Sequence, residues 1–343
     1  MNNDLYAQNE CREKCARTAA SRAHNRVGLG LFLFLLIPQV LVTVATLVFT
    51  LIDPAIVESI YFIWGAQFVA LYLIATPIAL LVIGRPPVGM PTAPKTRARP
   101  TTLLTVSCLM MSAAVAGSIL SNILMKVLGA LTNHSYENTT TEIVSETPIW
   151  LIILLVVIIG PLCEELVFRR ALMDRLLPFG ELGAIIISGA TFGLMHGNLF
   201  QLFYTVAVGF LLAYIYAKTR NFLCPLFLHM GFNFIGSVLP MAYIHLLEEI
   251  PGEEISSDAS ALLAWLSEHI FPLLVMLLHL FLMYGMAFAG VVLFFVFYKR
   301  IRFAPALIPL RGGTQLSARL LNVGMILFAI LSVALLGLSL IPT

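Results

Sequence analysis

Nine long apolar runs constrain what this chain can fold into. A helix needs roughly 20 apolar residues to cross the hydrocarbon core of a bilayer. Runs of about this length lie at 27–51, 59–84, 102–131, 149–173, 183–198, 200–217, 222–245, 270–297 and 320–341, of which 183–198 is the shortest. They are continuously apolar, whereas a transmembrane β-barrel needs alternating polar and apolar residues. The sequence therefore predicts an all-α polytopic membrane protein, a bundle of about 8–9 transmembrane helices.

The composition agrees with this prediction. Hydrophobic residues make up 59% of the chain and charged residues only 11%, with a mean hydropathy of +0.95, so a soluble globular surface cannot be built. Of the five cysteines, Cys108, Cys163 and Cys224 lie in apolar runs, and Cys11 and Cys15 lie in the polar N-terminal segment. We therefore expect no external disulfide framework.

The distribution of basic residues predicts the orientation. With nine spans and a cytoplasmic N-terminus, 19 of the 20 Lys and Arg residues fall in the inner segments, and only Lys126 remains. The outer segments contain no Lys or Arg but 11 of the 18 acidic residues. This is the positive-inside pattern. We expect an integral multi-pass protein, in the cell membrane, with its N-terminus in the cytoplasm.

A few strongly polar residues remain within the predicted spans. Inserting an ionisable residue at membrane depth costs about 2.5–3.5 kcal/mol, so each such residue marks a candidate functional site. The set comprises Glu164, Glu165 and Arg169 on the 149–173 run, His196 on the 183–198 run, and His229 and Asn233 on the 222–245 run. Two other histidines, His245 and His279, are expected to be interfacial or core residues.

The spacing of these residues predicts their arrangement. Glu165 and Arg169 are four residues apart and can form an ion pair, while Glu164 points about 100° away from Glu165. Pro161 removes one helix hydrogen bond just before the glutamates and is expected to kink the helix and open a pocket. Glycines at 189, 193 and 197 form a row that lets a neighbouring helix approach closely and would bring His196 near the glutamates.

Two carboxylates, two imidazoles and an amide are groups that can carry out peptide hydrolysis. A glutamate can take a proton from water that a histidine orients, and a second histidine and an amide can stabilise the oxyanion. A zinc-assisted route is the alternative, although the HExxH signature is absent and the sequence requires no cofactor. An ion or proton pathway and a non-catalytic scaffold also use such residues.

Three motifs extend this interpretation to a family. EELVFR at 164–169 fits EExxxR, FGLMH at 192–196 fits FxxxH, and HMGFN at 229–233 fits HxxxN. Their order on successive spans resembles the CPBP family of intramembrane proteases, which includes the type II CAAX prenyl endopeptidases. The resemblance covers roughly residues 149–245.

The resemblance implies roles for the polar residues. Glu164 would be the general base and His196 would help to activate water, while His229 and Asn233 would form the oxyanion hole. Glu165 and Arg169 would be a supporting pair. The family is often labelled metalloprotease, so the resemblance leaves Zn²⁺ possible and any metal ligands unknown.

The apolar runs and basic segments suggest a division of the chain, and the resemblance implies a substrate class. We expect a cytoplasmic basic tail at 1–26, two spans and a basic linker at 27–101, a protease core at 102–245, and C-terminal spans at 246–343. The predicted activity is an intramembrane endopeptidase that cuts near the cytoplasmic side, with CAAX-type prenylated or bacteriocin-like peptides as substrates. Its partners would be the lipid bilayer and a peptide or lipid-modified protein, and no nucleic acid.

Overall fold

The computed structural model describes residues 2–85, 96–244, 246, 259–309 and 314–341, and within these ranges every regular element is a helix. Seven helices are long and apolar enough to cross a membrane: Glu13–Ile52, Ile60–Ile83, Pro100–Thr132, Ile149–Phe179, Leu199–Thr219, Leu223–Met241 and Ile270–Arg300. Two shorter apolar helices, Glu181–Met195 and Val323–Leu338, match the remaining predicted runs. The prediction of an all-α polytopic membrane protein is confirmed.

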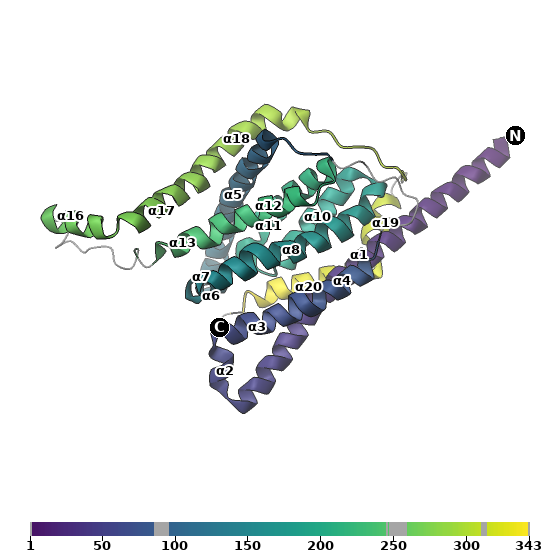
Figure 1. The fold of residues 1–343 in the computed structure, drawn as a ribbon. Helices are drawn as coiled ribbons and strands as arrows, with labels where there is room; N and C mark the ends of the chain where they lie inside the picture. Colours follow the sequence, from purple (N-terminus) through teal and green to yellow (C-terminus); the bar gives the residue numbers. More distant parts are fainter. Residues whose placement is uncertain (1, 86–95, 245, 247–258, 310–313, 342–343) are drawn as a thin grey trace.

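The first and last helices of the chain, α1 (Asn2–Ile52) and α20 (Val323–Leu338), pack together, as Figure 1 shows. The backbone of Gly324 lies so close to Asn25 that an added Cβ would stand 2.1 Å from the Asn25 carbonyl oxygen. The Asn25 side chain accepts a hydrogen bond from the Gly324 N–H at 2.8 Å. The helix α1 passes residue 26 without a break, and His24 is already buried in the core.

The second span runs back along α1 and carries Tyr72, whose hydroxyl lies beside Gly160 of the fourth span. It consists of α3 (Ile60–Gln67), a π-helical stretch at Phe68–Ala75, and α4 (Thr76–Ile83), after the short α2 (Pro54–Glu58). The third span, α5 (Pro100–Thr132), packs against α11 (Leu199–Thr219) and α18 (Met286–Phe297). A short helix, α6 (Thr139–Glu146), leads to the fourth span.

The fourth span contains two π-helical stretches. It is built from α7 (Ile149–Ile152), a π-helix at Ile153–Ile159, α8 (Gly160–Glu165), a second π-helix at Leu166–Met173, α9 (Asp174–Leu176) and a 3₁₀ turn at Leu177–Phe179. The Gly160 N–H bonds to the Leu155 carbonyl, five residues back. Pro161 follows and has no N–H to donate. The helix therefore continues through Pro161 in a widened register that leaves a backbone carbonyl unpaired along the helix.

The hairpin of α10 (Glu181–Met195) and α11 depends on two glycines. A Cβ at Gly189 would lie 1.9 Å from the Phe210 ring, and a Cβ at Gly193 would lie 2.1 Å from the Val206 side chain. These two positions confirm the predicted close approach. Gly197 does not belong to the row, because it lies beyond the end of α10 with φ +59°, where glycine is favoured over other residues.

The remaining helices complete the bundle. They are α12 (Leu223–Asn233), a π-helix at Phe234–Val238, α13 (Leu239–Met241), α16 (Ala259–Glu268), α17 (Ile270–Leu280), a π-helix at Phe281–Gly285, α18, a 3₁₀ turn at Tyr298–Arg300, and α19 (Thr314–Leu320). Figure 1 shows α16, α17 and α18 along one edge of the bundle.

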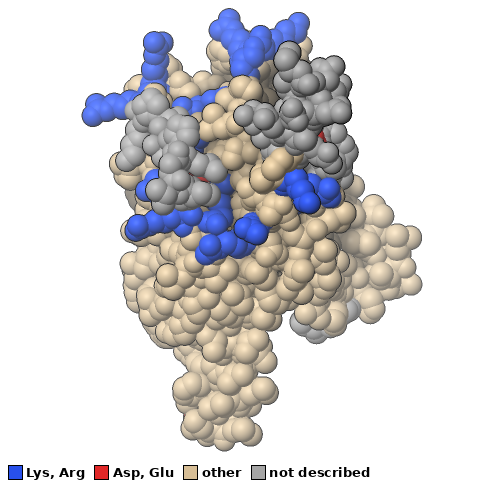
Figure 2. Space-filling model, turned by 90° about the vertical axis from the view of Figure 1, so that its right-hand side faces the viewer, with Lys and Arg blue, Asp and Glu red and all other residues tan. Residues whose placement is uncertain are grey.

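Basic side chains gather at one end of the bundle, as the blue residues in Figure 2 show. There Lys218 pairs with Glu181 at 2.8 Å and also donates to the Arg302 carbonyl at 2.6 Å. Arg319 donates to the Phe179 carbonyl, and Arg175 to the Ile83 carbonyl. We call this the basic end.

Candidate active site

The predicted ion pair forms the centre of the site. Arg169 Nε donates to Glu165 Oε2 at 2.8 Å, and both side chains are fully buried. Arg169 Nη1 also donates to the Ser188 hydroxyl of α10 at 2.6 Å. A buried charge is stable only when it is paired and hydrogen-bonded, and both conditions are met here. The predicted pairing of Glu165 with Arg169 is confirmed.

Glu165 also binds the histidine of α12. His229 Nδ1 lies 3.0 Å from Glu165 Oε1. A carboxylate only accepts hydrogen bonds, so His229 Nδ1 carries the proton and Nε2 points elsewhere. Glu165 thus bridges Arg169 and His229 and fixes the orientation of the imidazole.

Glu164 is the carboxylate that this network leaves free. Its Oε2 lies 3.7 Å from His229 Nε2, which is too long for a hydrogen bond, and its side chain is 16% exposed whereas that of Glu165 is fully buried. Two tyrosines from other spans, Tyr72 and Tyr204, interact electrostatically with it. The Tyr72 hydroxyl stands 3.1 Å from where a Cβ at residue 160 would lie, so the glycine there leaves room for it.

Phe192 holds the two histidines of the site in place. Its ring meets His196 edge-on at 5.1 Å and His229 at 5.6 Å, and Arg169 lies over it at 5.5 Å. His196 follows the last residue of α10, and its Nδ1 lies 2.8 Å from the Phe192 carbonyl oxygen. Since a carbonyl accepts, Nδ1 donates, and Nε2 of His196 is left as an acceptor.

Asn233 completes a helix–helix contact. Its Nδ2 donates to the Val156 carbonyl at 2.9 Å. In the π register of this stretch, the donor for Val156 would be the N–H of residue 161, which is a proline. Asn233 thus replaces the hydrogen bond that Pro161 cannot make. Nδ2 has a second N–H, so this contact leaves one donor for a ligand.

Among the described residues, the side chains of the site do not offer the ligand set of a catalytic zinc. Catalytic zinc is held by three protein ligands, and no group of three or more His, Cys, Asp or Glu residues that could hold a metal occurs in the part of the chain that the structure describes. Both oxygens of Glu165 already bind Arg169 or His229.

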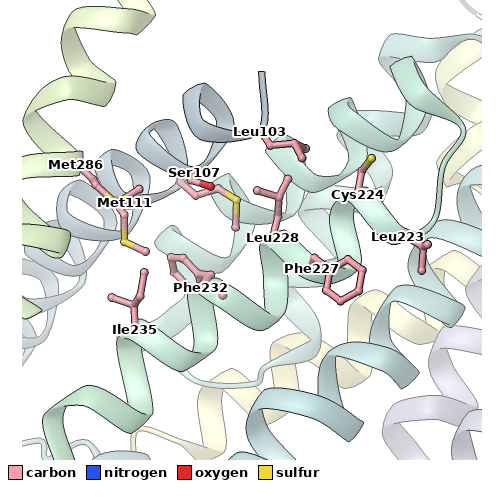
Figure 3. A pocket seen from close by; sticks show the side chains of 12 residues that line it. Leu103, Ser107, Met111, Leu223, Cys224, Phe227, Leu228, Phe232, Ile235 and Met286 are labelled. Atoms are coloured by element: carbon pink, nitrogen blue, oxygen red, sulfur yellow. The ribbon is translucent and has the colours of Figure 1, made fainter. Parts of the chain in front are cut away.

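Two cavities flank the helix that carries His229. An apolar cavity of about 290 Å³ lies between α5, α12 and α18 (Figure 3). A more polar cavity of about 570 Å³ lies between α5, α11 and the π-helices after α12 and α17. Met111 and Phe232 line both, so the cavities adjoin.

The other residues considered from the sequence lie apart from this network. His279 is buried as a core residue, and its Nδ1 is 2.6 Å from the Tyr243 hydroxyl. His245 lies outside the described residues. The five cysteines are free in the structure.

Comparisons with known proteins match this part of the chain. Residues 146–235 fit the family model described as "Type II CAAX prenyl endopeptidase Rce1-like". A protein of Bacillus subtilis (strain 168) with the name "Putative membrane peptidase YdiL" is 29% identical over 129 residues, which are 35% of this chain and 52% of that protein. An uncharacterised protein of Mycoplasma capricolum subsp. capricolum is 36% identical over 101 residues, 28% of this chain and 29% of that protein. No solved structure matches the chain.

The extent of these matches defines what they show. The chain spans about half of the Bacillus protein that it matches and less than a third of the Mycoplasma protein. All six polar residues of the site fall within the segment that the family model covers. The resemblance predicted from the motifs is therefore confirmed: residues 146–235 match the Rce1-like type II CAAX prenyl endopeptidase family.

Proposed function

We propose that this protein is an intramembrane endopeptidase in which Glu164 activates the hydrolytic water. One observation carries the proposal. Two adjacent glutamates have different surroundings. Glu165 is hydrogen-bonded by Arg169 and His229. Glu164 is not hydrogen-bonded to His229, because the two side chains are 3.7 Å apart, and it remains partly exposed. A base must be free to reach water, and of the two glutamates only Glu164 meets this requirement.

The neighbouring side chains supply the remaining steps. Glu164 takes one proton from water, and His196 Nε2 accepts a hydrogen bond from the same water, so its oxygen attacks the peptide carbonyl. The oxyanion accepts hydrogen bonds from His229 Nε2–H and the second Nδ2–H of Asn233. Glu164 then passes its proton to the leaving amide nitrogen, so the protons balance.

His229 can donate from Nε2 only when its ring is protonated, because Nδ1 already donates to Glu165. The carboxylate of Glu165 accepts from Nδ1 and holds the imidazole in this orientation. Arg169 in turn neutralises Glu165 and holds it in place. The supporting pair thus acts on the chemistry through His229.

The apolar cavity favours a substrate with an apolar group close to the scissile bond. Its lining includes Leu103, near the start of α5, and Leu223, the first residue of α12, both close to the basic end. If the basic end is cytoplasmic, as the positive-inside pattern predicts, such a substrate is cut near the cytoplasmic side. CAAX-type prenylated peptides and bacteriocin-like peptides are the classes that we propose.

The test compares peptides released from host cell membranes that contain the wild-type protein or the Glu164→Gln variant. We expect products with new termini from the wild-type membranes only. Equal release from both kinds of membrane, together with full cellular function of the Glu164→Gln variant, would favour a non-catalytic scaffold. An ion flux that depends on Glu164, without any cleaved product, would favour an ion or proton pathway.

A metal requirement is tested separately. With a glutamate-activated water, we expect chelators to leave the purified activity largely intact and elemental analysis to find well under one zinc per chain. Stoichiometric zinc that is lost and restored together with activity would overturn the metal-free mechanism.

A further inference from the structure

The polar cavity has no role in the function proposed above. Its volume is about 570 Å³, and Ser118, Asn122, Asn138, Gln201 and Tyr204 contribute polar atoms to its lining. Cavities of this size that are lined by polar groups hold water when two to four partners are in reach. Such a cavity is a candidate route for water to a catalytic site inside a membrane.

The hairpin of α10 and α11 has helices of unequal length. The ion pair of Glu181 with Lys218 marks its basic end. From Glu181 to Met195, α10 has 15 residues. At 1.5 Å per residue that is ~22 Å, while the hydrocarbon core is ~30 Å thick. Its partner α11, from Leu199 to Thr219, has 21 residues and is ~31 Å long, so the turn at the tip of the hairpin lies about one core thickness from the basic end.

This turn has irregular backbone, which lipid does not tolerate. Residues His196–Asn198 are not helical, and Gly197 adopts φ +59°. Where non-helical backbone lies within a membrane, it is buried in protein or lines a water-filled cavity. The Asn198 amide reaches the Asn138 side chain at 3.4 Å, and Asn138 lines the cavity.

The cavity wall continues into the site at three points. His196 begins the turn, and Phe200 in the first turn of α11 lines the cavity. Tyr204, one turn further, also lines it, and its ring centroid lies 6.4 Å from that of Phe232. Phe232 lines it as well and immediately precedes Asn233.

We propose that this cavity is a water-filled vestibule, open at the end opposite the basic end, from which the hydrolytic water passes Tyr204 to Glu164. The inference rests on the proposed peptidase function. The substrate's apolar group enters near the basic end, in the cavity of Figure 3, and water enters from the other side. Opposite entrances keep the apolar substrate from displacing the water supply.

Labelling of single cysteines tests the hydration without any need for activity. The variants are Ser118→Cys and Gln201→Cys in the vestibule and Ile123→Cys on α5, whose side chain is 55% exposed on the outside of the bundle. Sealed vesicles of each orientation receive a membrane-impermeant maleimide, and peptide mass spectrometry identifies each labelled position. The exposed native Cys11 and Cys15 report which side carries the basic end.

We expect the Ser118→Cys and Gln201→Cys variants to be labelled only from the side opposite to Cys11 and Cys15, and Ile123→Cys to stay unlabelled until detergent is added. A dry vestibule would leave all three unlabelled. Labelling of the vestibule from the side of Cys11 would also overturn the proposal.

A filled vestibule tests the supply of water. We expect Ser118→Phe to lower kcat about tenfold, equivalent to ~1.4 kcal/mol, with KM unchanged, because water access and not substrate binding is affected. The matched variant Ile119→Phe, on the outside of the same helix, should cleave at the wild-type rate. Unchanged kcat in a folded Ser118→Phe protein would overturn the proposal. The expected labelling with no cleavage by the wild type would instead overturn the proposed function, and the supply role with it.

Discussion

The helices Ile149–Phe179 and Ile270–Arg300 are alike in every property that hydropathy measures. Each has 31 residues, and their most apolar windows have mean hydropathies of 2.5 and 2.4. Half of the first window is buried inside the bundle, against 11% of the second. Hydropathy therefore identifies a span, and the ionisable residues identify which span lies at the centre.

Polar contacts explain the difference. The helix Ile149–Phe179 is tied to its neighbours by Arg169 with Ser188, by Glu165 with His229, and by the Val156 carbonyl with Asn233. The helix Ile270–Arg300 has fewer ties, such as the Ser112 hydroxyl with the Ala287 carbonyl at 2.5 Å. Most of its large side chains face outward, where lipid solvates them as well as protein would.

The largest effect is expected at Arg169. Its replacement by alanine strands the buried carboxylate of Glu165, which typically costs 3–5 kcal/mol of folding stability. We expect Arg169→Ala to show low yield and a low melting temperature in detergent. Arg300→Ala, at the exposed end of the other helix, should melt like the wild type. An Arg169→Ala protein with normal melting but no activity would give Arg169 a direct chemical role.

The next effect is expected at Asn233 and is one of rate. Loss of one oxyanion donor costs on the order of 10²–10³ in kcat. We expect Asn233→Ala to retain a residual activity that is lower than that of the wild type by this factor, measured as product release in proteoliposomes. His279→Phe removes a polar residue from the peripheral helix and should cleave at the wild-type rate. A wild-type kcat in Asn233→Ala would mean that Asn233 has only a structural role, through its hydrogen bond to the Val156 carbonyl.

The smallest effect is expected on the outer face. Phe288 is 75% exposed on α18, while Phe168 is fully buried against Phe192. Phe288→Ala should change the free energy of unfolding by no more than about 0.5 kcal/mol, and its partner variant Phe168→Ala should cost about 3–5 kcal/mol. Similar losses in both would mean that the peripheral helix is packed against something beyond this chain.

Much of this arrangement could be predicted from single stretches of sequence. The nine runs became helices because their length and polarity alone determine insertion. The pairing of Glu165 with Arg169 followed from their spacing on one helix. The division of the chain at 26, 101 and 245, the orientation and the substrate remain predictions.

The partners from other helices could not be predicted. Ser188, Tyr72 and Tyr204 reach the site because of how each helix is rotated and how deep it lies, which no local pattern encodes. Pro161 signalled a missing hydrogen bond, but the π register decides that Val156 is the carbonyl left over. Gly197 fits the four-residue glycine row only if the helix continues, and it ends at Met195.

The two adjacent carboxylates, Glu164 and Glu165, are assigned different roles, and one paired measurement tests this assignment. Glu164→Gln and Glu165→Gln are each purified, and melting and peptide release are recorded on the same samples. We expect Glu164→Gln to melt like the wild type and to release no product, because only the base is lost. We expect Glu165→Gln to melt well below the wild type, because Arg169 and His229 lose their shared partner. Cleavage by a folded Glu164→Gln protein, or equal melting losses in both variants, would contradict the assignment.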